Sequence, residues 1–244
     1  MEQQYVSLYS KPTQTNTGVI YFDANQTDKY FHNYFHITQP IRDLADIEDY
    51  EQQHASYGFV IFRVEHSIET KDYFKDYDMS HYGYFHAKVT DLKLKEAQVK
   101  PELVNPRNDQ PFFDFMHQDD IQFGESYALG NEKRQKEVLI QYPNTYFFIQ
   151  IKMNDQVVGH LSAFIHDTFA KIDEIYVVEA YQKQGYGSAL MSDMVRRLTQ
   201  IGITDVYLVT DLEDTAQALY RKMGYQFAGS FKQYQKSYKL QEIL

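Results

Sequence analysis

Apolar positions along the chain sort into two patterns, and both become sharper after Pro111. Runs of β-branched and aromatic residues predict strands, whereas apolar residues spaced by three and four predict helices. In the second half these patterns predict a largely helical segment over 112–142, strands over 145–153, 156–165, 170–178 and 205–210, helices over 185–201 and 215–223, and closing strands over 226–231 and 234–240. This order of elements is typical of an α/β sheet with mixed strand directions.

The first 110 residues are patterned less regularly. They predict a helix over 41–54 and strands over 19–22, 57–64 and 84–89. Three prolines lie between residues 100 and 111, which is typical of a connection between domains. The sequence therefore predicts an N-terminal α/β domain over residues 1–110 and a second domain over residues 111–244.

One junction between a strand and a helix carries candidate chemistry. The β-branched stretch 175–178 runs into a polar loop with Gly185 and Gly187, and this loop opens directly into the predicted helix. Glycines let a backbone approach a ligand closely, and the N–H groups of a first helical turn bind phosphate. Gln182 and Lys183 can add side-chain donors. The third glycine of the dinucleotide fingerprint and the Gly-Lys-Ser/Thr ending of the Walker loop are both missing. A glycine-containing turn that binds nothing stays as the alternative.

Two segments resemble motifs of the GNAT acyltransferases. Residues 182–187, Gln-Lys-Gln-Gly-Tyr-Gly, resemble the family's Arg/Gln-x-x-Gly-x-Gly/Ala signature, and residues 216–225, Ala-Gln-Ala-Leu-Tyr-Arg-Lys-Met-Gly-Tyr, resemble its Ala-x-x-Leu-Tyr-x-Lys-x-Gly-Phe/Tyr segment. Glu179 and Glu213 depart from the proline and asparagine that are common there. The resemblance covers about residues 111–240. It implies an α/β (α+β) fold, with a GNAT-type mixed, mostly antiparallel sheet flanked by helices, preceded by a smaller α/β N-terminal domain.

The resemblance also implies that acetyl-CoA is the co-substrate. In the family, the strand before the loop separates from its neighbour and binds the pantetheine arm, and the loop binds the pyrophosphate. The cofactor-binding residues implied in this way are Tyr176, Val177, Val178, Gln182, Lys183, Gln184, Gly185, Tyr186, Gly187 and Ser188. Tyr220 matches the tyrosine that protonates the departing CoA thiolate, a role for which a phenol is suited. Helical spacing alone favours a core aromatic at this position, and the match to the family segment reverses that preference.

The attacking amine must lose a proton, and a nearby carboxylate could accept it directly or through water. Asp173 and Glu174 begin the strand that leads to the loop. Side chains alternate along a strand, so counting by two from Tyr176 favours Glu174 as a catalytic residue. Two exposed carboxylates are the alternative. His160 and His166 could relay protons, but a lone histidine is more often structural, so neither is placed among the catalytic residues.

Composition and net charge limit the classes of molecule that the protein is expected to bind. The net charge is −10 and no basic stripe appears, which argues against nucleic acid and favours cationic amines. The absence of cysteine excludes an acyl-enzyme through sulfur, so the amine is expected to attack the thioester directly in a ternary complex. No His/Glu cluster has metal-site spacing, and no apolar run has the length of a bilayer span. We therefore expect no metal, no membrane partner and a cytoplasmic location.

The sequence predicts an N-acetyltransferase that acts on the primary amine of a small molecule. A GNAT-fold module that binds acetyl-CoA for regulation without turnover is one alternative, and acetylation of a protein or peptide amine is another. For residues 1–110 two interpretations stay open. The first is a degenerate GNAT-like copy, because 43–59 faintly echoes 211–225. The second is a cap that shapes the acceptor pocket or an oligomer interface, such as that of a homodimer.

Overall fold

The computed structural model describes residues 2–70, 72–95 and 99–238, and the chain divides into two compact units. Unit 1 comprises Tyr84–Thr210 and Thr215–Ala228, and unit 2 comprises Glu2–Gly83, Asp211–Asp214 and the chain from Gly229. The boundary passes through three strands, β5 (Asp78–Lys88), β10 (Asp205–Asp211) and β11 (Gln226–Ser237). The units are therefore discontinuous in sequence and do not follow the predicted division at residues 110 and 111. As a statement about separately folding domains, that division stays a prediction.

Unit 1 is built on a sheet in the order β10-β9-β8-β7-β6. Its strands are β6 (Glu102–Leu103), β7 (Tyr146–Met153), β8 (Gln156–His166), β9 (Phe169–Val177) and β10 (Asp205–Asp211). Neighbours from β6 to β9 are antiparallel, and β9 pairs in parallel with β10. The second half of β5 lies beside β10, where His86 Nε2 is 2.7 Å from Asp205 Oδ1. The mixed, mostly antiparallel sheet predicted from the sequence is thus confirmed.

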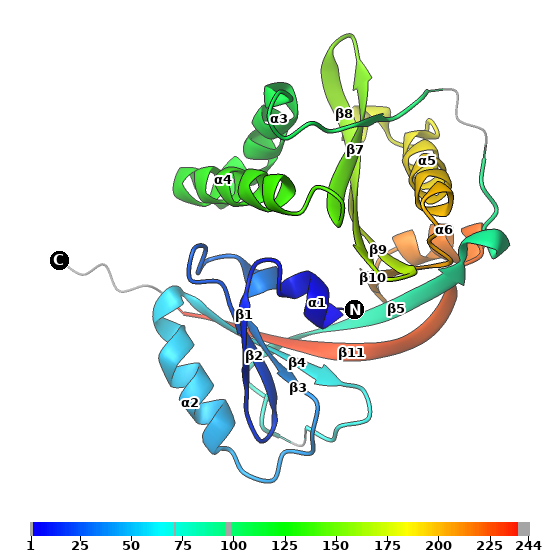
Figure 1. Cartoon of the computed structure of the whole chain (residues 1–244). Coiled ribbons are helices and arrows are strands. Elements are labelled where there is room, and N and C mark those ends of the chain that lie inside the picture. The colour runs from blue at the N-terminus through cyan, green and yellow to red at the C-terminus, as the bar shows by residue number, and fades with distance from the viewer. Residues whose placement is uncertain (1, 71, 96–98, 239–244) are drawn as a thin grey trace. The chain divides into compact units, whose positions relative to one another are not determined.

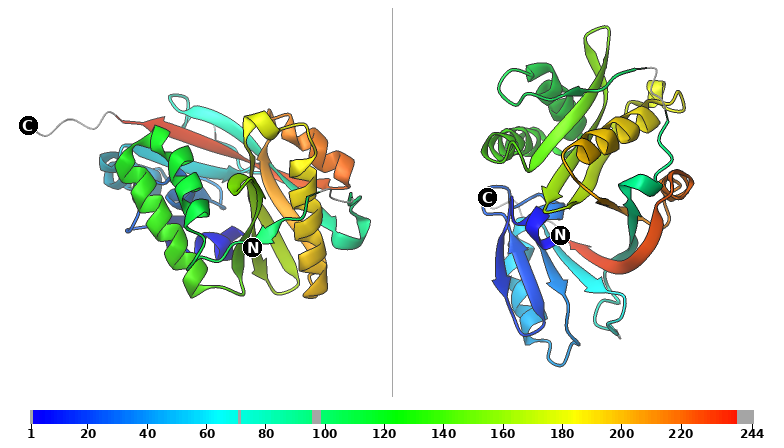
Figure 2. Two further views of the ribbon diagram at one scale, coloured as in Figure 1. Left: turned by 90° about the horizontal axis from the view of Figure 1, so that it is seen from above. Right: turned by 45° about the vertical axis from the view of Figure 1, so that its right-hand side comes forward.

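Helices cover both faces of this sheet. The helices α3 (Gln110–Asp120) and α4 (Glu125–Gln141) lie on one side of β7 and β8, and α5 (Tyr186–Gln200) lies on the other (Figure 1, Figure 2). Because it is covered twice, β8 is buried along most of its length. The predicted apolar stripe of α5 faces the core, and its buried members are Leu190, Met191, Met194, Val195 and Leu198. The short helix α6 (Ala216–Met223) follows β10 and ends at Gly224.

Unit 2 repeats part of this connectivity in fewer residues. Its elements are α1 (Glu2–Val6), β1 (Lys11–Gln14), β2 (Gly18–Phe22), β3 (Tyr34–Ile37), α2 (Ala45–His54) and β4 (Phe59–Glu65). The strand order is β1-β2-β3-β4-β11, with β3 and β4 parallel and the other neighbours antiparallel. In both units, three antiparallel strands lead into a helix and then into a parallel strand. This shared order is what a degenerate copy of the fold requires.

The end of the chain differs from the prediction. The expected closing strands over 226–231 and 234–240 are wrong as two elements, because one continuous strand, β11, runs from Gln226 to Ser237. Lys232 and Gln233, which lie between the two expected strands, pair with Val64 and Arg63 of β4, and the Gln233 side chain accepts a hydrogen bond of 3.0 Å from Arg63 Nε. Residues 239 and 240 lie outside the described residues. The short elements α1, β1 and β6 carry few apolar positions and were not predicted, and β3 was missed because its apolar run is only four residues long. Among the described helices, none combines the length and apolarity needed to cross a bilayer.

Candidate functional site

The strands β9 and β10 pair only where they begin. Their parallel register runs from Phe169 opposite Asp205 to Lys171 opposite Tyr207. Beyond that point β9 continues to Val177 and β10 to Asp211, and the register between them has ended. The later part of β9 is half-buried, whereas residues 170–172 are buried. The divergence leaves one edge of β9 without a neighbouring strand, and this edge leads straight into the polar loop.

The pairing of β9 with β8 shows which backbone groups of β9 point to its unpaired edge. Val178 donates its N–H to the carbonyl oxygen of Val158 at 2.9 Å, so Val178 faces β8. Successive residues of a strand alternate in the direction of their N–H and C=O groups. The peptide groups of Val177 therefore point to the edge that β10 has left. The side chain of Gln182 donates from Nε2 to the Val177 carbonyl at 3.0 Å.

The loop between β9 and α5 presents backbone N–H groups. A 3-10 turn over Glu179–Tyr181 is followed by Lys183 and Gly185 in the left-handed region, with φ of 61° and 93°. The first helical hydrogen bond runs from Ala189 N–H to Gly185 O at 2.9 Å. The N–H groups of residues 186–188 precede that ladder and have no partner within the helix. No atom outside the immediate chain lies within 4 Å of a Cβ built on Gly185, so the backbone is open there.

The loop glutamines fold back onto the backbone in this structure. Gln182 reaches the Val177 carbonyl, and Gln184 donates from Nε2 to the Ala180 carbonyl at 2.9 Å. The rings of Tyr181 and Tyr186 meet edge to face at 5.9 Å between centroids. These contacts stabilise the conformation of the loop. The polar groups that the loop leaves available to a ligand are mainly backbone N–H groups. Ligand binding by the residues predicted here stays a prediction.

A β-bulge interrupts β9 just before this edge. His160 pairs with Tyr176 and Ser162 pairs with Asp173, so two residues of β9 stand opposite Leu161 alone. The first of these, Glu174, has a φ of 50°, a left-handed conformation that costs a non-glycine residue on the order of 1 kcal/mol or more. Counting by two along β9 fails across a bulge. The alternation argument for Glu174 is therefore wrong, and its role as the catalytic base stays a prediction without that support.

The face of β9 that carries Tyr176 is the α3 face. The Tyr176 ring lies 5.8 Å from the rings of Phe115 and His160, and its hydroxyl donates a hydrogen bond to the carboxylate of Asp119 at the end of α3. Asp119 is exposed at the end of α3, but partial desolvation of its carboxylate raises its pKa, the charge of Asp120 raises it further, and the Tyr176 hydrogen bond acts in the opposite direction. Asp119 was missed by sequence reasoning, since no spacing marks one carboxylate among several on an exposed helix end.

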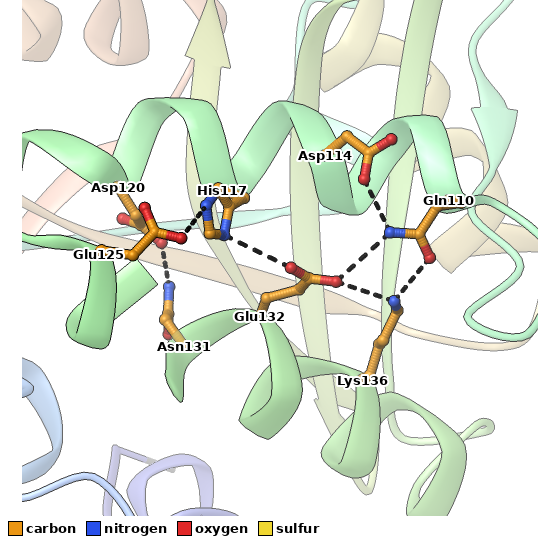
Figure 3. A network of polar contacts seen from close by, with 8 residues as sticks. All are labelled: Gln110, Asp114, His117, Asp120, Glu125, Asn131, Glu132 and Lys136. Carbon is orange, nitrogen blue, oxygen red and sulfur yellow. Dashed lines mark hydrogen bonds and ion pairs between the residues drawn. The ribbon is translucent and has the colours of Figure 1, made fainter. Parts of the chain in front are cut away.

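Polar contacts between α3 and α4 hold this helix end in place (Figure 3). His117 on α3 lies between two carboxylates of α4, with Nε2 3.4 Å from Glu125 Oε1 and Nδ1 3.5 Å from Glu132 Oε2. Asn131 donates from Nδ2 to Asp120 Oδ2 at 2.5 Å. His117 and Asp120, which lie on either side of Asp119 along α3, are thus both held by residues of α4. The fold therefore fixes the position of Asp119 over β9.

The remaining candidates have different surroundings. Tyr220 lies on α6 with its side chain buried, and its ring packs 6.1 Å from that of Tyr225. Its role toward the leaving thiolate stays a prediction. His160 is buried against the α3 face of the sheet, whereas His166 is half-exposed at the β8–β9 turn beside Asp167. Among the described residues, no group of three His, Asp or Glu side chains is placed to hold a metal ion.

Known proteins resemble this chain in both sequence and fold. The model of the acetyltransferase (GNAT) family matches residues 113–225. The uncharacterized N-acetyltransferase CgeE of Bacillus subtilis (strain 168) is 28% identical over 124 residues, which are 48% of this chain and 44% of that protein. The chain thus spans less than half of the length of this relative.

Two solved structures match nearly the whole chain. A functionally unknown conserved protein from Staphylococcus epidermidis ATCC 12228 superposes with a TM-score of 0.76 and 21% identity, over 96% of this chain and 97% of that one. A GCN5-related N-acetyltransferase from Kribbella flavida superposes with a TM-score of 0.67 and 14% identity, over 96% and 92%. At these identities the structures show a common fold. The family model is what identifies residues 113–225 of this chain as a domain of the acetyltransferase (GNAT) family.

Proposed function

We propose that the protein transfers an acetyl group from acetyl-CoA to the primary amine of a small cationic molecule. The observation that carries this proposal is the divergence of β9 from β10 immediately before an open helix start. A CoA molecule combines an amide-bearing arm with a pyrophosphate, and these two chemistries match an unpaired strand edge and a cluster of backbone N–H groups.

The donor would lie along the edge of β9. The pantetheine amides would exchange hydrogen bonds with the peptide groups of Val177, displacing the Gln182 side chain from its carbonyl. The pyrophosphate would accept hydrogen bonds from the N–H groups of residues 186–188 at the positive end of the α5 dipole. The first turn of α5 holds no acidic side chain that would oppose this charge.

The acceptor would approach from the α3 face. Asp119 offers a carboxylate there, and the rings of Phe115 and Tyr176 offer π faces to a cation. The overall charge of −10 adds a long-range attraction for cationic amines. This environment supports a cationic acceptor. Acetylation of a protein amine differs only in the acceptor and would give turnover with a peptide instead.

The chemistry is a direct displacement. The neutral amine nitrogen attacks the thioester carbonyl carbon, the carbon–sulfur bond breaks, and the thiolate takes a proton from the Tyr220 hydroxyl. The nitrogen loses its proton to a base or a bound water. Positioning of the two substrates would supply most of the rate enhancement, and a backbone N–H would polarise the carbonyl.

A panel of amines separates the proposal from its main alternative. Release of CoA thiol is followed with acetyl-CoA and either polyamines, aminoglycosides, uncharged primary amines or a lysine peptide. Saturable thiol release with the cationic small molecules supports the proposal. Tight CoA binding by calorimetry without thiol release from any amine would instead identify a regulatory acetyl-CoA-binding module.

A further inference from the structure

The face of the unit 2 sheet that is turned away from α2 carries an arginine among aromatic rings. Phe62 of β4 belongs to the core on which α2 packs, so its neighbour Arg63 points to the opposite face of the sheet. There the Cζ atom of Arg63 lies 3.9 Å from the ring centroid of Tyr34, 5.5 Å from that of Phe231 and 5.9 Å from that of Phe31. The guanidinium is therefore in cation–π contact with three rings.

A hydrogen bond to the neighbouring strand fixes the orientation of this guanidinium. Arg63 on β4 stands opposite Gln233 on β11, and Arg63 Nε donates to Gln233 Oε1 at 3.0 Å. A guanidinium is planar and presents its N–H groups as a rigid fork, with the two Nη groups at the end of the side chain. Because Nε is engaged by Gln233, the remaining donors of Arg63 are on these two Nη groups.

This guanidinium lacks a carboxylate partner. Among the residues that the structure describes, none of the Asp and Glu side chains forms an ion pair with Arg63. Glu65, two residues further along β4 on the same face, instead places Oε1 2.8 Å from His36 Nε2. Burial raises the pKa of Tyr34 to about 12, although the charge of Arg63 acts in the opposite direction, so the phenol is neutral at pH 7. The chain has 34 acidic and 24 basic residues, so a shortage of carboxylates does not explain the unpaired charge.

We propose that this face of unit 2 binds an aromatic monocarboxylic acid, whose carboxylate accepts hydrogen bonds from both Nη groups of Arg63 and whose ring packs on Phe31. The two oxygens of a carboxylate match the guanidinium fork and form two parallel, charge-assisted hydrogen bonds. Phe31 offers an apolar ring surface because it is 57% exposed, whereas Tyr34 and Phe231 are buried. The inference does not rest on the proposed acetyl transfer, since all of these residues belong to unit 2.

The charge of the site favours a carboxylate over a phosphate. Arg63 supplies one positive charge, which neutralises a single carboxylate. A phosphate dianion would keep an uncompensated charge on the same face as the Glu65 carboxylate, in a protein of net charge −10. Removing that second charge from water would cost free energy that the site does not return.

Two substitutions separate a binding site from an arginine that only packs against aromatic rings. Arg63→Lys keeps the positive charge but lacks the planar fork. Phe31→Ala removes the exposed ring and leaves the buried rings in place. The matched control is Arg221→Lys in unit 1, because Arg221 is also exposed and stacked, with Cζ 5.0 Å from the ring centroid of Phe85.

The test is a titration of the 15N-labelled full chain, followed by NMR, with benzoate, phenyl phosphate and uncharged benzamide. We expect benzoate to shift the Arg63 Nε–H and Gln233 side-chain amide resonances until they saturate, with a Kd of about 1 mM for a ligand of this size. Read from the Gln233 amide, this Kd should rise at least about fivefold in Arg63→Lys and about threefold in Phe31→Ala, and stay within about twofold in Arg221→Lys. Phenyl phosphate should bind more weakly than benzoate, and benzamide should cause no saturable shift.

Saturable benzoate binding that is weakened in both variants, with the midpoint of thermal unfolding retained, supports the proposal. If Arg63→Lys does not fold, the exposed Phe31→Ala decides the question by itself. The absence of a benzoate shift well above the expected Kd overturns the proposal, and so does binding that is equally strong in Arg63→Lys. Tighter binding of phenyl phosphate than of benzoate would overturn the assignment to a carboxylate.

Discussion

The two units place a helix after a strand in the same topological position, and the strand pairing before that helix differs between them. In unit 2, β3 pairs with β4 up to its last residue, since Ile37 stands opposite Val64. In unit 1, the parallel pairing of β9 ends at Lys171, and the strand runs on unpaired on that side to Val177. A shared strand order therefore does not create a cofactor site. We expect the early end of the pairing to create one, because it leaves peptide groups available to a ligand.

The helix starts differ in charge as well. The first turn of α2 carries Asp46 and Glu48, and Asp46 Oδ2 accepts hydrogen bonds from the N–H and hydroxyl of Thr17 at 3.1 and 2.7 Å. Acidic side chains at a helix N-terminus satisfy the dipole from within the protein and repel phosphate. The first turn of α5 has none and begins behind Gly185. We therefore expect unit 1 to bind CoA and unit 2 not to bind it.

The largest effect should come from closing the open helix start of unit 1. Gly185→Glu adds a Cβ at a φ of 93° and a negative charge beside the N–H groups that would hold the pyrophosphate. The KM for acetyl-CoA should rise about a hundredfold, an effect of roughly 2.7 kcal/mol. Gly202→Glu is the matched control, because Gly202 has a φ of 89° and equally open surroundings at the other end of α5. Equal KM values in the two variants would contradict the assignment.

A second substitution tests whether unit 1 also carries the chemistry. Tyr220→Phe removes the hydroxyl that would protonate the thiolate and keeps the buried ring beside Tyr225. We expect kcat to fall about thirtyfold, within the contribution that one acid or base makes, and the KM for acetyl-CoA to stay within about twofold. Tyr225→Phe, which alters the neighbouring ring, is the control. If kcat is unchanged in Tyr220→Phe, Tyr220 is a core aromatic residue and does not protonate the thiolate.

A smaller effect is expected on the acceptor side. Asp119→Asn should raise the KM for a cationic amine about tenfold and leave the KM for acetyl-CoA unchanged, since the carboxylate faces the amine and not the donor. The pKa of Asp119 is raised, so its charge is lost on acidification earlier than that of an ordinary aspartate. The amine KM of the wild type should therefore rise as the pH falls towards this pKa, and that rise should vanish in Asp119→Asn.

Asp114→Asn on the same helix is the control for this substitution. Asp114 is exposed, and its carboxylate accepts a hydrogen bond from Gln110 Nε2 at 2.7 Å. If both variants change the amine KM alike, the effect is one of net charge and not of a defined acceptor site.

The smallest effect is expected at Glu174, whose left-handed backbone conformation has no equivalent in the corresponding strand β3 of unit 2. Glycine adopts the φ of 50° at position 174 without penalty, so Glu174→Gly should raise the free energy of unfolding by about 0.5 to 1 kcal/mol, and the β-branched Glu174→Val should lower it by at least as much. Chemical denaturation measures both. Retention of kcat in Glu174→Gly would also remove this residue as the base, whereas its loss with an intact fold would support that prediction.

Much of unit 1 could be predicted because its signals are local. The apolar run of β8, the stripe of α5 and the glycine at residue 185 each report their own environment, and the two family-like segments fix their order along the chain. The early end of the β9–β10 pairing was implied by the family resemblance and not by any local signal. Two further features could not be predicted. The bulge at Glu174 and the contact between Asp119 and Tyr176 both depend on residues that are distant in sequence. The bulge matters most, because it invalidates counting along β9 to find a base.

Calorimetric titration of the full chain with CoA tests the central comparison most directly. The account predicts one CoA bound per chain, with binding weakened strongly by Gly185→Glu and unaffected by Asp46→Asn at the start of α2. Two CoA molecules per chain would show that unit 2 binds as well, and no measurable binding would contradict the assignment of the β9–α5 junction as a CoA site.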